Sequence, residues 1–258
     1  MTPQLISKQP KLGTTIFTVM SGLAAEVGAV NLGQGFPDFE CDPQLTHAVT
    51  KAMQEGLNQY PPMPGVLPLR EAVSQKIESL YHRHYDAQTE ITITAGATQA
   101  LLTIMLAVVH PGDEVIVTNQ DHEANVGAWR RLADHGMIVK EWQINNDTAE
   151  LEIDDLKALL SEKTKIVAVT HCSNIVGSIN DLKSIAELVH QYDAYIVGDG
   201  VSYAPHGFPD VKSLDVDFYA FSLYKTYGPH LGLLYGKKEI LNQLPNQNHE
   251  FLEGDVPY

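Results

Sequence analysis

The chain has 258 residues, of which 44% are hydrophobic and 19% are charged, as in ordinary soluble globular proteins. Its 17 basic and 32 acidic residues give a net charge of −15. Nucleic acids and anionic membranes reward clustered Lys and Arg, so this balance argues against either as the main partner. Any anionic ligand is expected to be held by local donors, against an unfavourable overall field.

The two cysteines, Cys41 and Cys172, lie far apart in the sequence and form no CxxC pair. They predict neither a disulfide framework nor a zinc site, and we expect no bound metal. The sequence opens without a basic segment followed by an apolar stretch, and no apolar run is long enough to span a bilayer. We therefore expect a cytoplasmic protein.

The first 40 or so residues are rich in Gly and Pro, and they predict an extended arm rather than a packed unit. A helix is expected next, with Leu45 and Met53 on one face and Gly56 as its stop. Another helix is predicted from about Leu69, where apolar residues recur at helical spacing.

From residue 90 onward, short apolar segments alternate with amphipathic helices. Continuous apolar runs are typical of strands buried on both faces. Seven strands are predicted: Ile91–Thr94, Glu114–Thr118, Ile138–Gln143, Lys165–Thr170, Ala194–Asp199, Asp217–Ser222 and Leu231–Tyr235. Asn180 is the expected N-cap of the clearest crossover helix.

Seven strands with helical crossovers predict an α/β fold, a doubly wound and mostly parallel sheet with an N-terminal arm. We place the arm, or small-domain segment, at residues 1–45 and the large domain at residues 46–258. In such sheets ligands bind at the carboxyl ends of the strands.

The first strand ends in a small-residue turn, Thr94–Thr98, that leads into a helix. Free N–H groups and the dipole at a helix N-terminus suit a phosphate, although an ordinary strand-to-helix turn fits this segment equally well. Neither a Walker pattern nor a GxGxxG follows, which disfavours a nucleotide.

Two more polar residues follow apolar strands. Asp199 closes the fifth strand and is, taken alone, either a helix cap or a functional carboxylate. Lys225 follows the sixth strand among the aromatic residues Phe221 and Tyr224, and a desolvated lysine is a better nucleophile.

A phosphate cradle, a lysine for an aldehyde and a carboxylate for a pyridine nitrogen are together what pyridoxal 5'-phosphate (PLP) requires. An anion about 4 Å from a pyridinium gains about 4 kcal/mol at an effective dielectric of about 20. That energy corresponds to about three pKa units, enough to keep the ring nitrogen protonated near neutral pH.

Two sets of motifs resemble families of PLP enzymes. Over about residues 8–117 the chain resembles the class I aminotransferases, particularly the methionine/kynurenine branch, through Lys11–Phe17, Asn31–Phe39, Asn58–Tyr60, Met63–Gly65 and Thr94–Thr98. Over about residues 112–258 it resembles the class V aminotransferases, which include cysteine desulfurases, through Asp121–Asn125, Thr170–Asn174, Asp199–His206 and Phe218–Pro229. We interpret the chain as a hybrid of two families that share one fold.

The resemblance implies a role for each matched residue. Lys225 would form the Schiff base with PLP and shuttle the substrate α-proton, Asp199 would pair with the ring nitrogen, and His122 would stack on the ring. The implied cofactor contacts are Gly96, Ala97, Thr98 and Ser222 at the phosphate, Asn174 at the phenolic oxygen, Ser202 and Tyr224 where class V proteins usually carry Gln and His, and Tyr60 at a neighbouring subunit's phosphate. Gly35 would lie against the substrate carboxylate.

Both families continue past the position of Tyr258 into a small C-terminal domain whose Arg clamps the substrate carboxylate, and we expect this chain to lack both. The leading function is a PLP-dependent transaminase that acts on an amino acid and a 2-oxo acid, as a homodimer. Two alternatives stay open: a class V lyase or cysteine desulfurase, and a PLP-binding remnant without turnover. Cys172 is interpreted as structural, because a desulfurase cysteine belongs on a loop in that C-terminal region.

Overall fold

The structure, a computed structural model, describes residues 13–33, 35 and 39–245, and the chain divides into two compact units, residues 1–60 and 61–258. The first unit contains α1 (Ile16–Val27) and α2 (Pro43–Gln54). The helix predicted to stop at Gly56 is therefore confirmed as α2.

Helix α1 corrects the prediction of an extended arm. Thr15 caps it, because its side-chain oxygen accepts a hydrogen bond from the Thr18 amide, and Gly28 ends it in a left-handed conformation. The prediction relied on the overall Gly and Pro content of the segment, which does not reveal a short capped helix within it. Neither α1 nor α2 contains a buried residue.

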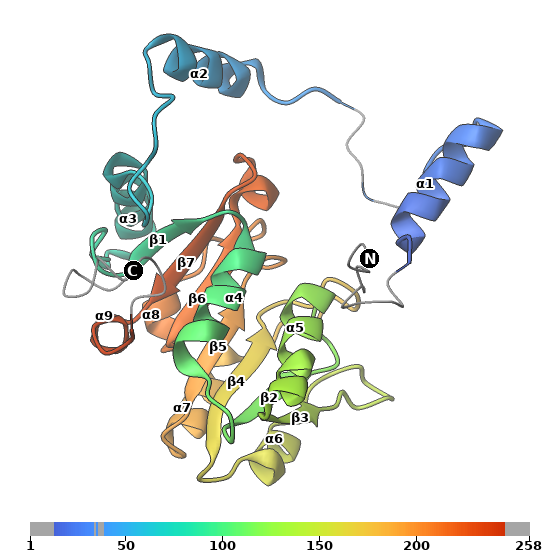
Figure 1. The fold of residues 1–258 in the computed structure, drawn as a ribbon, viewed down its shortest axis with the longest axis vertical. Helices are drawn as coiled ribbons and strands as arrows, with labels where there is room; N and C mark the ends of the chain where they lie inside the picture. The colour runs from blue at the N-terminus through green and yellow to red at the C-terminus, as the bar shows by residue number, and fades with distance from the viewer. Residues whose placement is uncertain (1–12, 34, 36–38, 246–258) are drawn as a thin grey trace, which may run out of the picture. The chain divides into compact units, whose positions relative to one another are not determined.

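The second unit is built on one seven-stranded sheet, and this confirms the predicted fold. The strands are β1 (Ile91–Thr94), β2 (Glu114–Thr118), β3 (Ile138–Trp142), β4 (Thr164–Thr170), β5 (Tyr195–Asp199), β6 (Phe218–Ser222) and β7 (Gly232–Gly236). Their order is β1-β7-β6-β5-β4-β2-β3, and β7 alone runs antiparallel to the other six strands (Figure 1).

Helices cover both faces of this sheet. They are α3 (Leu67–Tyr81), α4 (Ala97–Val108), α5 (Gly127–Arg130), α6 (Ile153–Leu159), α7 (Leu182–His190), α8 (Val211–Leu214) and α9 (Lys238–Leu241), with 3₁₀ turns η1 (Glu123–Asn125), η2 (Arg131–His135) and η3 (Leu223–Thr226). The clearest crossover helix, α7, begins at the N-cap Asp181, whose carboxylate accepts a hydrogen bond from the Ser184 amide. The prediction of Asn180 as the cap is wrong, because its buried side chain donates hydrogen bonds to Gln120 and to the Thr170 carbonyl instead.

Alternating residues of the strands divide between two hydrophobic cores. Val115 and Val117 of β2 pack with α4 on one face, whereas Ile116 belongs to the core that contains α3 and α7. Side chains of a strand alternate between faces, so a sheet with a core on each side needs an apolar residue at nearly every position. This explains the continuous apolar runs in the sequence.

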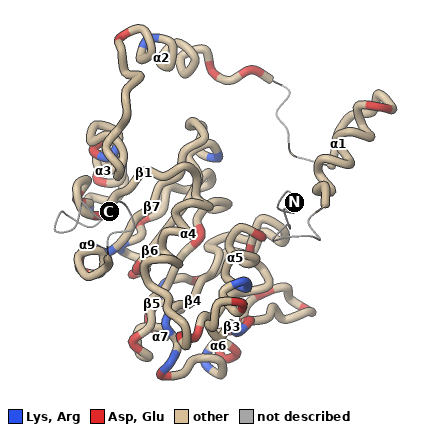
Figure 2. The backbone as a smooth tube through the Cα atoms, in the orientation of Figure 1, with Lys and Arg blue, Asp and Glu red and all other residues tan. Residues whose placement is uncertain are grey.

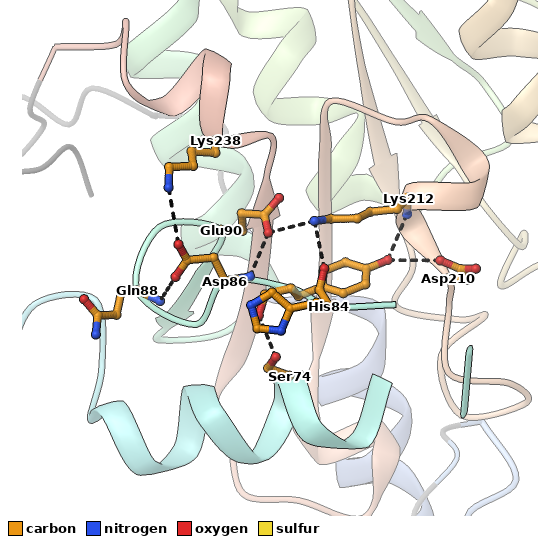
Figure 3. Close-up of polar contacts among 9 residues, drawn as sticks. Ser74, His84, Asp86, Gln88, Glu90, Asp210, Lys212 and Lys238 are labelled. Carbon is orange, nitrogen blue, oxygen red and sulfur yellow. Dashed lines mark hydrogen bonds and ion pairs between the residues drawn. The ribbon is translucent and has the colours of Figure 1, made fainter. Parts of the chain in front are cut away.

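A polar network beside the start of β1 and the end of β7 ties the segment between α3 and β1 to α8 and α9 (Figure 3). Glu90 accepts hydrogen bonds from the Asp86 amide at 2.8 Å and from Lys212 Nζ at 2.9 Å. The buried Tyr85 donates its hydroxyl to Asp210 at 3.1 Å and accepts from the Lys212 amide at 2.9 Å.

We expect Tyr85→Phe to lower the free energy of unfolding by about 1–2 kcal/mol, because it leaves the Lys212 amide and the Asp210 carboxylate without this partner. Urea unfolding monitored by circular dichroism measures the change. Tyr195→Phe is the matched control, because the Tyr195 hydroxyl makes no hydrogen bond to a described residue. Equal losses in the two variants would contradict the prediction.

Basic residues are spread over separate elements, among them α2, α3, α6 and α9, and acidic residues lie between them (Figure 2). None of the helices within the described residues combines the length and the apolar character needed to cross a bilayer.

Candidate active site

A pocket lies where the carboxyl ends of β4, β5 and β6 meet the N-terminus of α4. The lining residues are Ala97, Thr98, Leu101, His122, Ala124, Thr170, Asn174, Asp199, Val201, Ser202, Ser222, Tyr224 and Lys225.

Most residues predicted from the sequence meet in this pocket. The nine that line it are Ala97, Thr98, His122, Asn174, Asp199, Ser202, Ser222, Tyr224 and Lys225. Gly96 is the N-cap of α4, directly before Ala97. Tyr60 and Gly35 belong to the first unit, so their roles stay predictions. Parts of the arm motifs, including Lys11 and Phe36, lie outside the described residues.

The N-terminus of α4 forms a cradle of backbone amides. Gly96 has a φ of 92°, and no side chain caps the helix, so the amides of its first turn have no intrahelical acceptor. Gly232 of β7 packs directly beneath this turn: a Cβ there would lie 2.6 Å from the Ala97 nitrogen. Close packing against Gly232 therefore supports this turn, and Ala97 and Thr98 at the start of α4 line the pocket, where their amides suit an anion.

Asp199 is the buried carboxylate of the pocket, with 4% of its surface exposed. Burial raises the pKa of Asp199, and the Val201 amide, which donates to Oδ1 at 2.9 Å, counteracts part of that rise. His122 and Lys225 also lower the pKa of Asp199 through their charges. A carboxylate whose ionised form is disfavoured by burial is stabilised by a cationic ligand, which a protonated pyridine nitrogen supplies.

Lys225 lies on η3, one turn beyond the end of β6, and is half-buried. Within the described residues its Nζ has no hydrogen-bond acceptor and no ion-pair partner, so the amine is available to a ligand. The aromatic Phe221 is packed in the core, and Tyr224 is exposed and stacks on His230 at 4.8 Å between ring centroids.

His122 and Asn174 lie on the loops that follow β2 and β4. The Nδ1 of His122 accepts a hydrogen bond from the Ala124 amide at 3.1 Å, which places the proton of the neutral ring on Nε2. Asn174 directly follows Ser173, whose hydroxyl accepts from the amides of Ile175 and Val176 at 3.3 Å. Both loops thus present a polar side chain to the pocket from a fixed turn.

Sequence reasoning missed four lining residues, Leu101, Ala124, Thr170 and Val201. Thr170 ends β4, so the strand-end rule could have identified it. Leu101, Ala124 and Val201 are apolar. Ala124 and Val201 lie within the motifs Asp121–Asn125 and Asp199–His206, but an apolar residue type does not indicate a role at a polar site.

Asp121, next to His122, is a further buried carboxyl. Burial raises the pKa of Asp121 to about 7, and the charge of Asp199 adds to that rise, whereas hydrogen bonds from Thr118 and Asn125 oppose it. Asn125 in turn accepts from Trp129 Nε1 at 2.9 Å. The carboxyl therefore belongs to a buried polar chain beneath the pocket.

We expect Asp121→Asn to gain stability relative to the wild type as the pH rises from about 4 to about 7. The unfolded carboxyl ionises near pH 3.9, and the folded one near pH 7, so the folded state binds more protons in this range and loses stability as the pH rises. An Asn lacks this slope, which is at most about 1.4 kcal/mol per pH unit. Unfolding free energies at several pH values test this. The exposed Asp154→Asn is the control, and parallel pH profiles for wild type and Asp121→Asn would overturn the prediction.

The chain has the parts that define a PLP-binding α/β enzyme: an amide cradle, a buried carboxylate and an unpaired lysine around one pocket. The family model of the class V aminotransferases matches residues 46–250, and the chain belongs to this family. The cofactor of the family is PLP, and these residues fit it. No group of three or more His, Cys, Asp or Glu side chains in the part of the chain that the structure describes is placed to hold a metal ion.

Three curated relatives illustrate the similarity. An aminotransferase-like protein, FGM3, of Gibberella zeae is 46% identical over 166 residues, which are 63% of this chain and 41% of that protein. The methionine aminotransferase of Escherichia coli is 38% identical over 198 residues (76% and 50%), and a cysteine desulfurase of Dickeya dadantii is 36% identical over 181 residues (68% and 43%). The chain thus spans about half the length of the relatives it matches.

Solved structures give the same result. YbdL of Escherichia coli, described as a methionine aminotransferase, superposes with a TM-score of 0.80 at 32% identity, covering 92% of this chain and 65% of that one. The cysteine desulfurase CsdA of Escherichia coli superposes with a TM-score of 0.66 at 30% identity, covering 79% of this chain and 54% of that one. Both kinds of relative expected from the sequence motifs are therefore found.

Proposed function

We propose that this protein is a PLP-dependent transaminase that moves an amino group from an amino acid to a 2-oxo acid, with Lys225 as the residue that bonds to the cofactor. One observation carries the proposal: the unpaired Lys225 amine and the buried Asp199 carboxylate line the same pocket as the open N-terminus of α4. The similarity to an Escherichia coli methionine aminotransferase supports an amino acid as the substrate.

Each residue of the pocket has a task in this proposal. The amides of Ala97 and Thr98 bind the phosphate, and Ser222 adds a hydroxyl. Asp199 would hold a proton on the ring nitrogen, and His122 would cover a face of the ring. PLP supplies an electron sink when bound.

In this proposal Lys225 is the residue that transfers the proton. When PLP is bound, the Lys225 amine would take the α-proton of the substrate and return it to another atom. Asn174 and Ser202 orient the ring edge by hydrogen bonding, in positions supported by their place in the pocket lining.

The test is an absorbance and product assay of the purified protein with PLP. We expect a band of lysine-bound PLP near the edge of the visible range, which decays when amino acid donors are added as 2-oxo acids accumulate. Release of sulfide and alanine from cysteine would favour a desulfurase instead. A band that no amino donor changes would contradict transamination and favour a binding protein.

We further propose a homodimer. Ile175, Ile179 and Tyr227, beside the pocket-forming strand ends, are 75%, 66% and 85% exposed, and exposed apolar side chains of this size favour a protein contact. Light scattering after size exclusion tests this, and a monomeric mass at high concentration would contradict it.

The unpaired cysteines Cys41 and Cys172 support a cytoplasmic location, which cell fractionation tests.

A further inference from the structure

Two loops carry side chains that line the cofactor site proposed above. The loop after β2 carries His122, and the loop after β4 carries Asn174; both line the pocket and both are exposed. Because both side chains are exposed, contacts on the solvent side do little to restrict their positions. The distance between them therefore depends on what joins their loops beneath the pocket.

Gln120 makes this connection. Its side chain is 3% exposed and does not line the pocket. Its Oε1 accepts a hydrogen bond from Asn180 Nδ2 at 2.8 Å. Its Nε2 donates to the Ser178 hydroxyl at 2.8 Å and to the Ala149 carbonyl at 2.8 Å. Every polar atom of this side chain is bonded to a residue outside its own loop.

The backbone of Gln120 adds a further connection. Its carbonyl accepts from the Ser173 hydroxyl at 3.1 Å, and Ser173 directly precedes Asn174. Asn180 also donates to the Thr170 carbonyl at 2.8 Å, so the loop after β4 is fixed near both of its ends. Gln120 itself lies two residues before His122.

We infer that Gln120 is a positioning residue: it sets the spacing of His122 and Asn174 across the cofactor site without touching the cofactor. A buried glutamine with both side-chain polar atoms bonded is costly to replace, because each partner left in the protein interior loses its hydrogen bond. Asn180 is held by the same contact, and this explains why it does not cap α7.

The test begins with Gln120→Met, which keeps the length of the side chain and removes its hydrogen bonds. We expect the dissociation constant of PLP, measured by absorbance titration, to rise about tenfold or more. The milder Ser178→Ala removes one bond and leaves Gln120 in place, so it should weaken PLP binding in the same direction by less. Val189→Ala is the matched control, because it destabilises the α7 core away from the pocket and should change PLP affinity less than about twofold.

A double-mutant comparison separates positioning from general stability. In a variant that already carries His122→Ala and Asn174→Ala, Gln120→Met should cost less than about twofold in PLP affinity, because the side chains through which it acts are gone. An undiminished loss in that background would overturn the inference, and so would wild-type affinity in Gln120→Met. A wild-type protein that binds no PLP would instead overturn the cofactor site itself.

Discussion

Lys225→Ala is expected to abolish the absorbance band of lysine-bound PLP and to lower transamination by at least about 10²–10⁴-fold, the contribution of a positioned proton-transfer group. The reason is that Lys225 is an amine that lines the pocket without a hydrogen-bond or ion-pair partner among the described residues. Its removal takes away both the covalent link and the base for the α-proton. Stopped-flow absorbance with an amino acid donor and a steady-state assay measure the two losses.

The matched control is Lys157→Ala. Lys157 is exposed on α6, where Ala is also a favourable residue, so the variant should keep the band and the activity. PLP is still expected to bind to Lys225→Ala noncovalently, because the amide cradle and Asp199 remain. A Lys225→Ala protein with an intact band of lysine-bound PLP would show that another lysine holds the cofactor.

Much of the second unit could be predicted from the sequence, because strands buried on both faces leave an unambiguous pattern. All seven predicted strands exist, with ends that differ by about one residue from those observed; β3, for example, ends at Trp142 instead of Gln143. Strand ends then located the site, since Asp199 ends β5 and Lys225 follows β6. The polarity of a strand end is a local feature, and local features can be read from one sequence.

Long-range contacts could not be predicted in the same way. The side chain of Gln120 bonds to Ser178 and Asn180, which are 58 and 60 residues away, so its sequence neighbours contain no sign of its role. Asn180 looked like an ideal cap for the same reason: its tertiary partners are invisible locally. Helix α1 was missed because composition was averaged over a segment in which capped helix and loop alternate.

The relatives show that the two similarities of the hybrid overlap along the chain. An alignment of 198 residues to a methionine aminotransferase cannot fit within residues 8–117, and one of 181 residues to a cysteine desulfurase cannot fit within residues 112–258. Both similarities therefore extend across the region where the motifs change. The shared fold explains this overlap.

Asp199→Asn is expected to have opposite effects on the ligand-free protein and on catalysis. Without ligand, burial disfavours the ionised carboxylate, so the folded pKa lies above the unfolded one and ionisation above about pH 4 favours the unfolded state. An Asn removes this penalty and keeps an acceptor for the Val201 amide. The ligand-free variant should therefore unfold at a higher temperature than the wild type at neutral pH.

With PLP bound, the same substitution removes the anion that keeps the ring nitrogen protonated. A loss of about 4 kcal/mol at an effective dielectric of about 20 corresponds to a fall of about 10³-fold in turnover. Asp154→Asn, an exposed substitution, should change neither quantity. An Asp199→Asn variant that is less stable without ligand and also inactive would indicate a structural defect. A variant that is more stable without ligand but has lost turnover would instead show that the charge of Asp199 serves the ligand and destabilises the ligand-free fold.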